Sequence, residues 1–183
     1  SYIDLGTNHP IIDNNTFGMY VNGCRGINIE ANPRLIGIIE EKRPEDININ
    51  VGIGTKDELL PFYKWDDMSG RNTFCSSEIQ YWGGKKPTEI VELQVTTLST
   101  IIDKFCPNGF PDYLDCDIEG MDYDVLESFD LYNDGPKVIC VEVKKMQINK
   151  FDKMLKSKGY FRFCRIVCNN IYVRDEYSMK LLM

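Results

Sequence analysis

The chain has 183 residues, of which 43% are hydrophobic, and its formal net charge is −7. Length and hydrophobic content predict a single globular domain over residues 1–183 with one sizeable core. Proteins that bind nucleic acid present clusters of Lys and Arg side chains to the phosphates. The net negative charge of this chain therefore argues against nucleic acid as a partner.

The seven cysteines form no Cys-x-x-Cys pair, and a chain with this much core does not need a disulfide scaffold. We therefore expect buried free thiols in a reducing cytoplasm. No apolar run reaches the roughly 20 residues that span a bilayer, and the N-terminus lacks a signal-peptide pattern. These observations predict a cytoplasmic protein with no membrane span. A core strand that begins as early as residue 2 is compatible with a native protein that starts further upstream.

Apolar strands alternate with helical stretches along the chain, which predicts an α/β fold with a mostly parallel sheet and an antiparallel last strand. The elements expected in the first part are an opening strand, a helix from Pro10 to about Asn22, a strand at Gly26–Glu30, a helix from Asn32-Pro33 to about Lys42, and an edge strand at Ile47–Ile53. An irregular insertion or lid is expected at about 54–90, with a possible added strand at Leu59–Tyr63.

The second part continues the alternation. The expected elements are a strand at Glu92–Thr96, a helix at about Ser99–Phe105, a central strand at Tyr113–Glu119, a helix at about Tyr123–Phe129, a strand at Lys137–Val143, a helix at Asn149–Lys158, and an antiparallel hairpin of Tyr160–Val167 with Asn170–Arg174.

The opening stretch, Ser1–Pro10, is a strand that ends in an acid and a glycine, the arrangement of a nucleoside cradle at the carboxyl end of a parallel strand. A dinucleotide site uses G-x-G-x-x-G to approach a pyrophosphate, but here only Gly6 is present. The turn therefore favours S-adenosylmethionine, which has no phosphate, over NAD. Glu30 ends the second strand at a spacing from Asp4 that suits an acid bound to ribose hydroxyls, although a solvated strand-end glutamate is the alternative.

Asp115, Asp117 and Glu119 alternate along the expected central strand, so we expect all three carboxylates on one face. Such crowding of like charges needs a cation, a basic partner or protonation. Asp117 and Glu119 are candidate ligands of Mg²⁺ or Ca²⁺, and either is a candidate acceptor for the proton of an attacking hydroxyl. Pairing with lysines such as Lys144 is the purely structural alternative.

Three blocks resemble the signatures of FkbM-type S-adenosylmethionine-dependent methyltransferases: Tyr2–Asn8, Asn28–Pro33 and Asp117–Asp122. Secondary matches in the expected order are Asn72–Phe74, Val95–Leu98, Val138–Glu142 and Gly159-Tyr160. The resemblance implies a Rossmann-like class I methyltransferase sheet of seven strands and methyl transfer to a hydroxyl, often of a sugar or glycan.

The resemblance also implies roles for residues of this chain. Asp117 and Glu119 would lie beside the transferred methyl group as catalytic residues. The residues assigned to cofactor binding are Asp4, Gly6 and Asn8 at the methionine end, Glu30 at the ribose, and Thr7, Asn32, Gly52 and Thr73 nearby.

The resulting hypothesis is an S-adenosylmethionine-dependent O-methyltransferase that acts on a sugar, glycan or other small hydroxyl compound. One alternative is an NAD-type Rossmann oxidoreductase or epimerase. Another is a non-catalytic cofactor-binding or glycan-binding module that uses the aromatic residues Phe62, Tyr63, Trp65 and Trp82.

Overall fold

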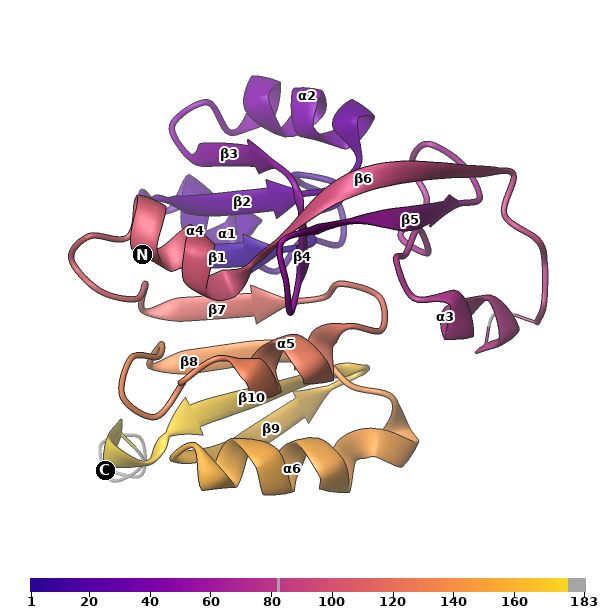
Figure 1. The fold of residues 1–183 in the computed structure, drawn as a ribbon. Helices are drawn as coiled ribbons and strands as arrows, with labels where there is room; N and C mark the ends of the chain where they lie inside the picture. The colour runs from indigo at the N-terminus through magenta and orange to yellow at the C-terminus, as the bar shows by residue number, and fades with distance from the viewer. Residues whose placement is uncertain (82, 178–183) are drawn as a thin grey trace.

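A seven-stranded sheet forms the centre of the computed structural model, which describes residues 1–81 and 83–177 (Figure 1). In spatial order its strands are β3 (Ile47–Asn50), β2 (Gly26–Glu30), β1 (Tyr2–Leu5), β7 (Tyr113–Cys116), β8 (Val138–Glu142), β10 (Asn169–Arg174) and β9 (Tyr160–Ile166). The first five are mutually parallel, whereas β10 runs antiparallel to both β8 and β9. The prediction of a mostly parallel sheet with an antiparallel last strand is confirmed.

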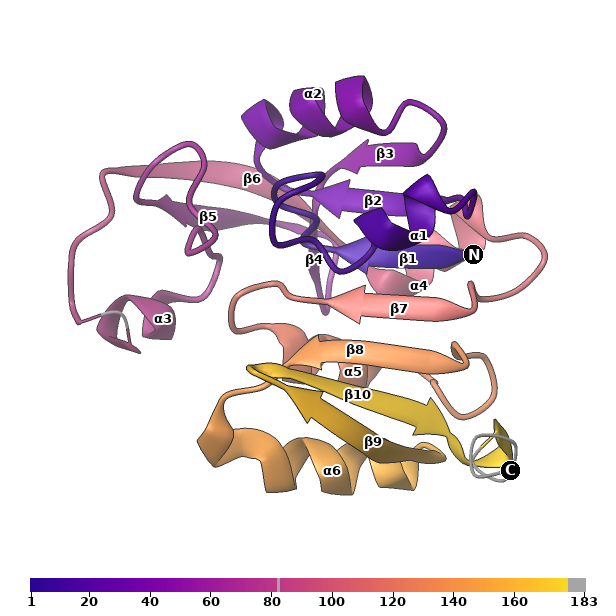
Figure 2. The same ribbon diagram turned by 180° about the vertical axis from the view of Figure 1, so that it is seen from behind.

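Helices cover both faces of this sheet. They are α1 (Phe17–Val21), α2 (Pro33–Lys42), α4 (Leu98–Phe105), α5 (Asp122–Ser128) and α6 (Ile148–Ser157), with a short 3₁₀ turn, η1 (Lys145–Gln147). Figure 1 shows α4 and α5 on the near face, and Figure 2 shows α1 on the opposite one. Buried apolar side chains of the central strands and of α4, α5 and α6 form one core cluster. Ligands in such sheets bind at the carboxyl ends of the strands.

A second, three-stranded sheet projects from the first and forms an arm (Figure 1). It consists of β4 (Gly52–Gly54), β6 (Glu89–Thr97) and β5 (Glu58–Lys64), and the connection from β5 to β6 carries the helix α3 (Ser76–Tyr81). The added strand predicted at Leu59–Tyr63 is therefore confirmed as β5.

The expected strand Ile47–Ile53 is in fact two strands in different sheets. β3 lies at the edge of the main sheet, as predicted, and the chain leaves that sheet at Val51 to form β4. A Cβ atom at Gly52 would lie 2.6 Å from the ring of Phe74. The absence of a side chain at Gly52 thus lets β4 pack directly against the ring of Phe74, in the connection from β5 to β6.

The helix expected from Pro10 to Asn22 is wrong over most of its length, because α1 begins only at Phe17. Side chains take up the backbone N–H groups before it: Nδ1 of His9 accepts from Ile11 and Ile12, and Oδ1 of Asn14 accepts from Thr16 and Phe17. Short polar side chains that bond neighbouring amides compete with helix formation in this way.

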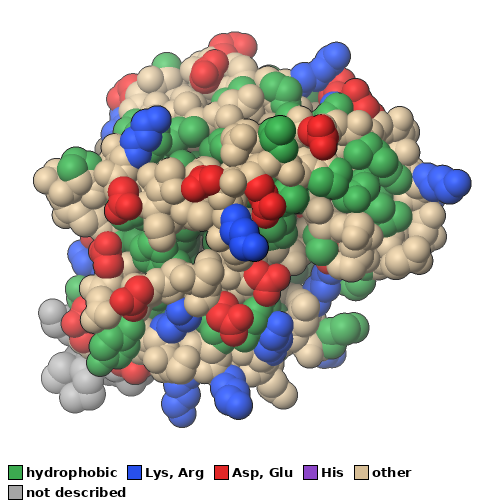
Figure 3. Space-filling model, viewed as in Figure 1, with side chains coloured by type: hydrophobic (Ala, Val, Ile, Leu, Met, Phe, Trp, Pro, Cys, Tyr) green, Lys and Arg blue, Asp and Glu red, His purple; other side chains and the backbone are tan. Residues whose placement is uncertain are grey.

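Three further features are the surface charges, the cysteines and the length of the helices. On the face drawn in Figure 3, acidic and basic side chains are interspersed, with several Lys and Arg side chains along its lower edge. All seven cysteines are free thiols, but only Cys116 and Cys140 are buried, so the expectation of buried thiols is wrong for the other five. Among the residues that the structure describes, no helix is long and apolar enough to cross a membrane.

Candidate active site

A pocket of about 550 Å³ opens at the carboxyl ends of β1, β2 and β7, on the side where the arm joins the sheet. Apolar, aromatic and polar side chains line it together, as is usual for a site that binds a small organic ligand. The predicted site residues that line it are Gly6, Asn8, Glu30, Gly52, Thr73, Asp117 and Glu119. The tertiary structure thus brings together residues that lie far apart in the sequence.

The opening turn packs tightly against the end of the central strand. Gly6 has φ = 81°, and its N–H group and that of Thr7 both donate to the carbonyl of Ile29, at 2.9 and 3.1 Å. A Cβ atom on Gly6 would overlap the carbonyl oxygen of Asp117 and lie 3.0 Å from its carbonyl carbon. Only glycine combines this backbone conformation with such a close approach.

Asn8 and Glu30 form one wall of the pocket. The N–H group of Asn8, which has φ = 51°, donates to Oε2 of Glu30 at 2.8 Å, and the N–H group of Asn32 donates to Oε1 at 2.8 Å. Burial raises the pKa of Glu30 to about 7. Each carboxylate oxygen has a second lone pair, so Glu30 can still accept hydrogen bonds from a ligand. The side-chain oxygen Oδ1 of Asn8 is buried and has no hydrogen-bond partner in the described part of the chain.

Three residues assigned to cofactor binding lie outside the pocket lining. Asp4 is buried, accepts from Oγ1 of Thr16 at 2.6 Å, and lies 3.9 Å from the guanidinium of the fully buried Arg43. Thr7 is also buried, and its hydroxyl donates to the carbonyl oxygen of Asp4 at 3.3 Å. Asn32 caps α2 instead of facing the pocket. These three residues hold the pocket walls in place from behind.

The prediction that Asp115, Asp117 and Glu119 share one face of a strand is wrong, because β7 ends at Cys116. Beyond it the backbone turns, with φ = 52° at Glu119 and φ = 107° at Gly120. Both oxygens of Asp122 stabilise this turn, accepting from the N–H groups of Ile118 at 2.9 Å and Gly120 at 3.0 Å.

The side chain of Asp115 therefore lies apart from those of Asp117 and Glu119. Its oxygens accept from Nδ2 of Asn15, both at 3.2 Å. Burial, with repulsion from Asp4, raises the pKa of Asp115 to about 7. Asp115 does not line the pocket.

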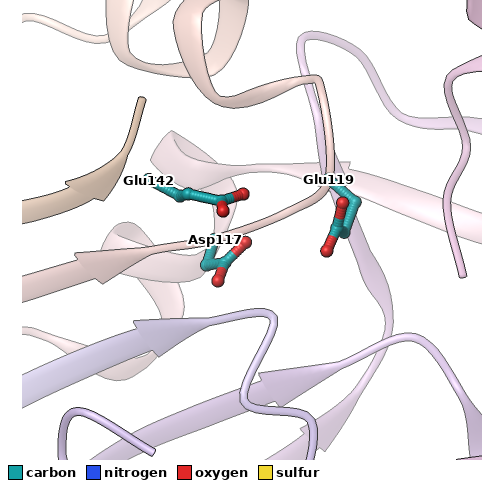
Figure 4. Close-up of side chains that lie close together, drawn as sticks. All are labelled: Asp117, Glu119 and Glu142. Atoms are coloured by element: carbon teal, nitrogen blue, oxygen red, sulfur yellow. The ribbon is translucent and has the colours of Figure 1, made fainter. Parts of the chain in front are cut away.

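A different third carboxylate joins Asp117 and Glu119. Glu142 ends β8, and one oxygen from each of these three side chains lies within 4.8 Å of the others. Figure 4 shows the side chains converging from the ends of β7 and β8 and from the turn. Glu142 is not among the predicted site residues, although it ends the matched block Val138–Glu142. The parallel pairing of Cys116 with Val141 places the following residues, Asp117 and Glu142, side by side, so two acids at the ends of neighbouring parallel strands were the available signal.

The carboxylate cluster of Asp117, Glu119 and Glu142 is electrostatically unfavourable without a cation or protons. Burial and the charges of neighbouring acids raise the pKa of Asp117 well above its ordinary value. Burial and repulsion from Glu142 raise the pKa of Glu119 to about 8. Oδ1 of Asp117 is buried without a hydrogen-bond partner among the described residues. Lys144, suggested as a partner, instead binds Glu78.

The arm contributes directly to this site. Oγ1 of Thr73 donates to the carbonyl oxygen of Glu119 at 2.6 Å and accepts from the N–H group of Cys75 at 2.8 Å. Phe62 and Phe74 lie side by side on the arm, with ring centroids 4.7 Å apart, and both line the pocket. They supply an apolar surface to the pocket, and neither is among the predicted cofactor-binding residues.

Comparison with known proteins adds one match. The family model described as the methyltransferase FkbM domain matches residues 4–162. The search of curated proteins found no match. The search of solved structures also found none.

Proposed function

The chain belongs to the FkbM methyltransferase family, a methyltransferase assignment that implies S-adenosylmethionine as the usual cofactor, and from this premise we propose that it methylates a hydroxyl group of a sugar, glycan or other small molecule. The observation that carries the proposal is the junction of a pocket at the strand ends with a cluster of partly buried carboxylates. The pocket supports binding of the methyl donor, and the carboxylate cluster supports removal of a proton from the acceptor.

The polar and aromatic groups of the pocket suit S-adenosylmethionine. Oδ1 of Asn8 and Oδ1 of Asp117 are buried acceptors that lack a donor in the described residues, and the ammonium group of the methionine end would supply one. Glu30 would accept from the ribose hydroxyls. Phe62 and Phe74 would pack against the adenine. The single glycine of the opening turn leaves no diphosphate cradle of the G-x-G-x-x-G type, which disfavours an NAD-type oxidoreductase or epimerase.

When bound, S-adenosylmethionine supplies an electrophilic methyl group that passes to the acceptor oxygen as the sulfonium becomes a neutral thioether. The chain's own contribution is positioning and proton transfer. Glu119, held by Thr73 and by the turn that Asp122 stabilises, would accept the hydroxyl proton on its carboxylate. Its pKa of about 8 suits a base that works near neutral pH.

A divalent ion is the second candidate role for the carboxylate cluster. Three carboxylate oxygens lie within 4.8 Å of one another, and oxygen ligands of this kind suit Mg²⁺ or Ca²⁺. In that case Asp117 and Glu119 would be ligands, and the ion would lower the pKa of the acceptor hydroxyl. Activity that is abolished by a chelator and restored by Mg²⁺ or Ca²⁺ would favour this role over proton transfer to Glu119.

A non-catalytic glycan-binding module is supported less well. Of the aromatic residues that suggested it, Phe62 is buried in the arm and lines the pocket, and the indole N–H of Trp65 donates to the carbonyl of Lys85 at 3.0 Å. Trp82 lies outside the described residues.

Isothermal titration with S-adenosylmethionine and with NAD tests the donor. We expect binding of the first, and tighter binding of NAD would overturn the proposal. Release of S-adenosylhomocysteine in the presence of hydroxyl acceptors tests the reaction. Glu119→Gln should reduce the rate by about 10²–10⁴-fold, whereas Glu92→Gln, which makes the same change at an exposed position on β6, should have no effect.

A further inference from the structure

A second cavity lies beside the donor pocket, with an empty volume of about 500 Å³. Its walls come from α3, from the turn after β7, from α5, and from the segment between the end of β8 and α6. The side chains that define its chemistry are Glu78, Glu119, Asp122, Tyr123, Glu142 and Lys144. This second cavity has no role in the donor site described above.

Glu119 is the residue that the two spaces share. It lines both the donor pocket and the second cavity, whereas Asp117 lines only the first and Glu142 only the second. The carboxylate cluster, whose three side chains Figure 4 shows, therefore stands at the boundary between them. A group bound in the second cavity can reach the carboxylate of Glu119 without entering the donor pocket.

The second cavity carries an excess of negative charge at its wall. Four carboxylates line it, and among the described residues Lys144 is the one basic side chain in the lining. Lys150 does not line the cavity, although its ammonium lies 3.4 Å from the centroid of the Tyr123 ring. The Lys144 ammonium already binds both oxygens of Glu78 and lies 3.7 Å from the centroid of the Tyr81 ring. The oxygens of Asp122 are occupied by backbone N–H groups. Glu119 and Glu142 are left facing the cavity, and neither forms an ion pair within residues 1–81 and 83–177.

The second cavity also has an aromatic side. The rings of Tyr123 and Phe151 both line it, meeting edge to face with centroids 5.3 Å apart. Carboxylates opposite aromatic carbon suit a compact organic molecule that has polar groups on one side and C–H groups on the other. A bare metal ion would leave the aromatic side without a contact.

We propose that the second cavity is the acceptor site, and that the acceptor carries a protonated amine as well as the hydroxyl to be methylated, as an amino sugar does. The ammonium would bind Glu142, and the hydroxyl would lie against Glu119. The identification as an acceptor site rests on the proposed methyltransferase function, whereas the preference for an ammonium rests on the cavity alone. A neutral polyol would leave the charge of Glu142 unbalanced, and an anionic sugar would be repelled.

Three pyranoses of similar size provide a charge series to test this: glucosamine, glucose and glucuronate. Each is titrated into the ¹⁵N-labelled full chain with and without an excess of S-adenosylhomocysteine, and binding is followed by chemical shifts of Gly120, Tyr123 and Glu142. We expect glucosamine to bind about tenfold more tightly than glucose, and glucuronate not to bind. Glu142→Gln should remove the preference for glucosamine, whereas Asp124→Asn, the same loss of charge at an exposed position on α5, should keep it.

Equal binding of glucose and glucosamine, or any binding of glucuronate at these resonances, would overturn the proposal. Tight binding of Mg²⁺ or Ca²⁺ that shifts the same resonances and displaces glucosamine would also overturn it, in favour of a metal site. S-adenosylhomocysteine affinity is measured separately by calorimetry on the same samples. Failure of that binding while glucosamine still binds would refute the donor assignment and leave the ammonium preference supported.

Discussion

Replacing Gly6 with alanine tests whether the opening turn and the carboxylate cluster depend on each other. At φ = 81° the new Cβ atom would overlap the Asp117 carbonyl oxygen and lie 3.3 Å from Cγ2 of Ile118. Gly23 offers a matched control, because its φ is 87° and nothing lies within 4 Å of a Cβ atom built there. Both variants bear the same backbone penalty, so their difference isolates the contact with Asp117.

The left-handed backbone should cost each variant about 1–2 kcal/mol of unfolding free energy. Gly6→Ala should lose a further 1–3 kcal/mol, roughly, because the Asp117 carbonyl must move. A shift of that carbonyl by about 1 Å would displace the cluster and should reduce the methyl-transfer rate by about 10²-fold. Gly23→Ala should keep the wild-type rate.

Urea denaturation followed by circular dichroism measures the stabilities, and calorimetry with S-adenosylmethionine measures donor affinity. Equal destabilisation of Gly6→Ala and Gly23→Ala, together with an unchanged rate in both, would refute the argument that Gly6 positions Asp117. Loss of donor binding without loss of stability would place the role of Gly6 in cofactor contact instead.

Three further predictions concern the supports of the site. Thr73→Val removes a donor to Glu119 and should lower the unfolding free energy by about 1–3 kcal/mol, with a reduced rate. Asp122→Asn weakens the two bonds that hold the turn and should cost about 1.5–3 kcal/mol, with little change in donor affinity. Because burial raises the pKa of Glu30 from 4.5 to about 7, its stabilising contribution is present below about pH 4.5 and is lost as the pH rises through about 7. The unfolding free energy should therefore fall by up to roughly 3 kcal/mol over that range, and Glu30→Gln should flatten the decrease.

Thr73→Ser keeps the hydroxyl and serves as the control for Thr73→Val; if both variants lose the same stability, the hydrogen bond to Glu119 is unimportant. For Asp122→Asn, an unchanged melting temperature would show that the turn does not need the charged cap. For Glu30, parallel pH profiles of the wild-type protein and Glu30→Gln would assign the pH dependence to other acids.

The order and type of most elements followed from the sequence. Alternation of apolar strands with helices predicted the parallel sheet, and the short connection at Cys168-Asn169 predicted the final hairpin, because these signals are local and repeat along the chain. The resemblance of the blocks around Asp4, Glu30 and Asp117 to a family was likewise readable from sequence, and the family match over residues 4–162 confirmed it.

Local competition for backbone hydrogen bonds was harder to predict. The helix expected at Pro10 fails because His9 and Asn14 take up the amides that would begin it. The strand expected at Tyr113–Glu119 ends early because Asp122 binds amides two and four residues before it. Both outcomes depend on side-chain geometry that a binary pattern of apolar and polar residues does not encode.

Sequence alone determined that this chain carries acids at strand ends around a single-glycine turn. Which of those acids meet was decided by the tertiary structure. Asp115 points to Asn15, while Glu142 joins Asp117 because β7 and β8 are neighbours in register. Strand order and register are set by packing between segments far apart in the chain, so charges that are distant in sequence become close, and their repulsion arises only in the folded protein.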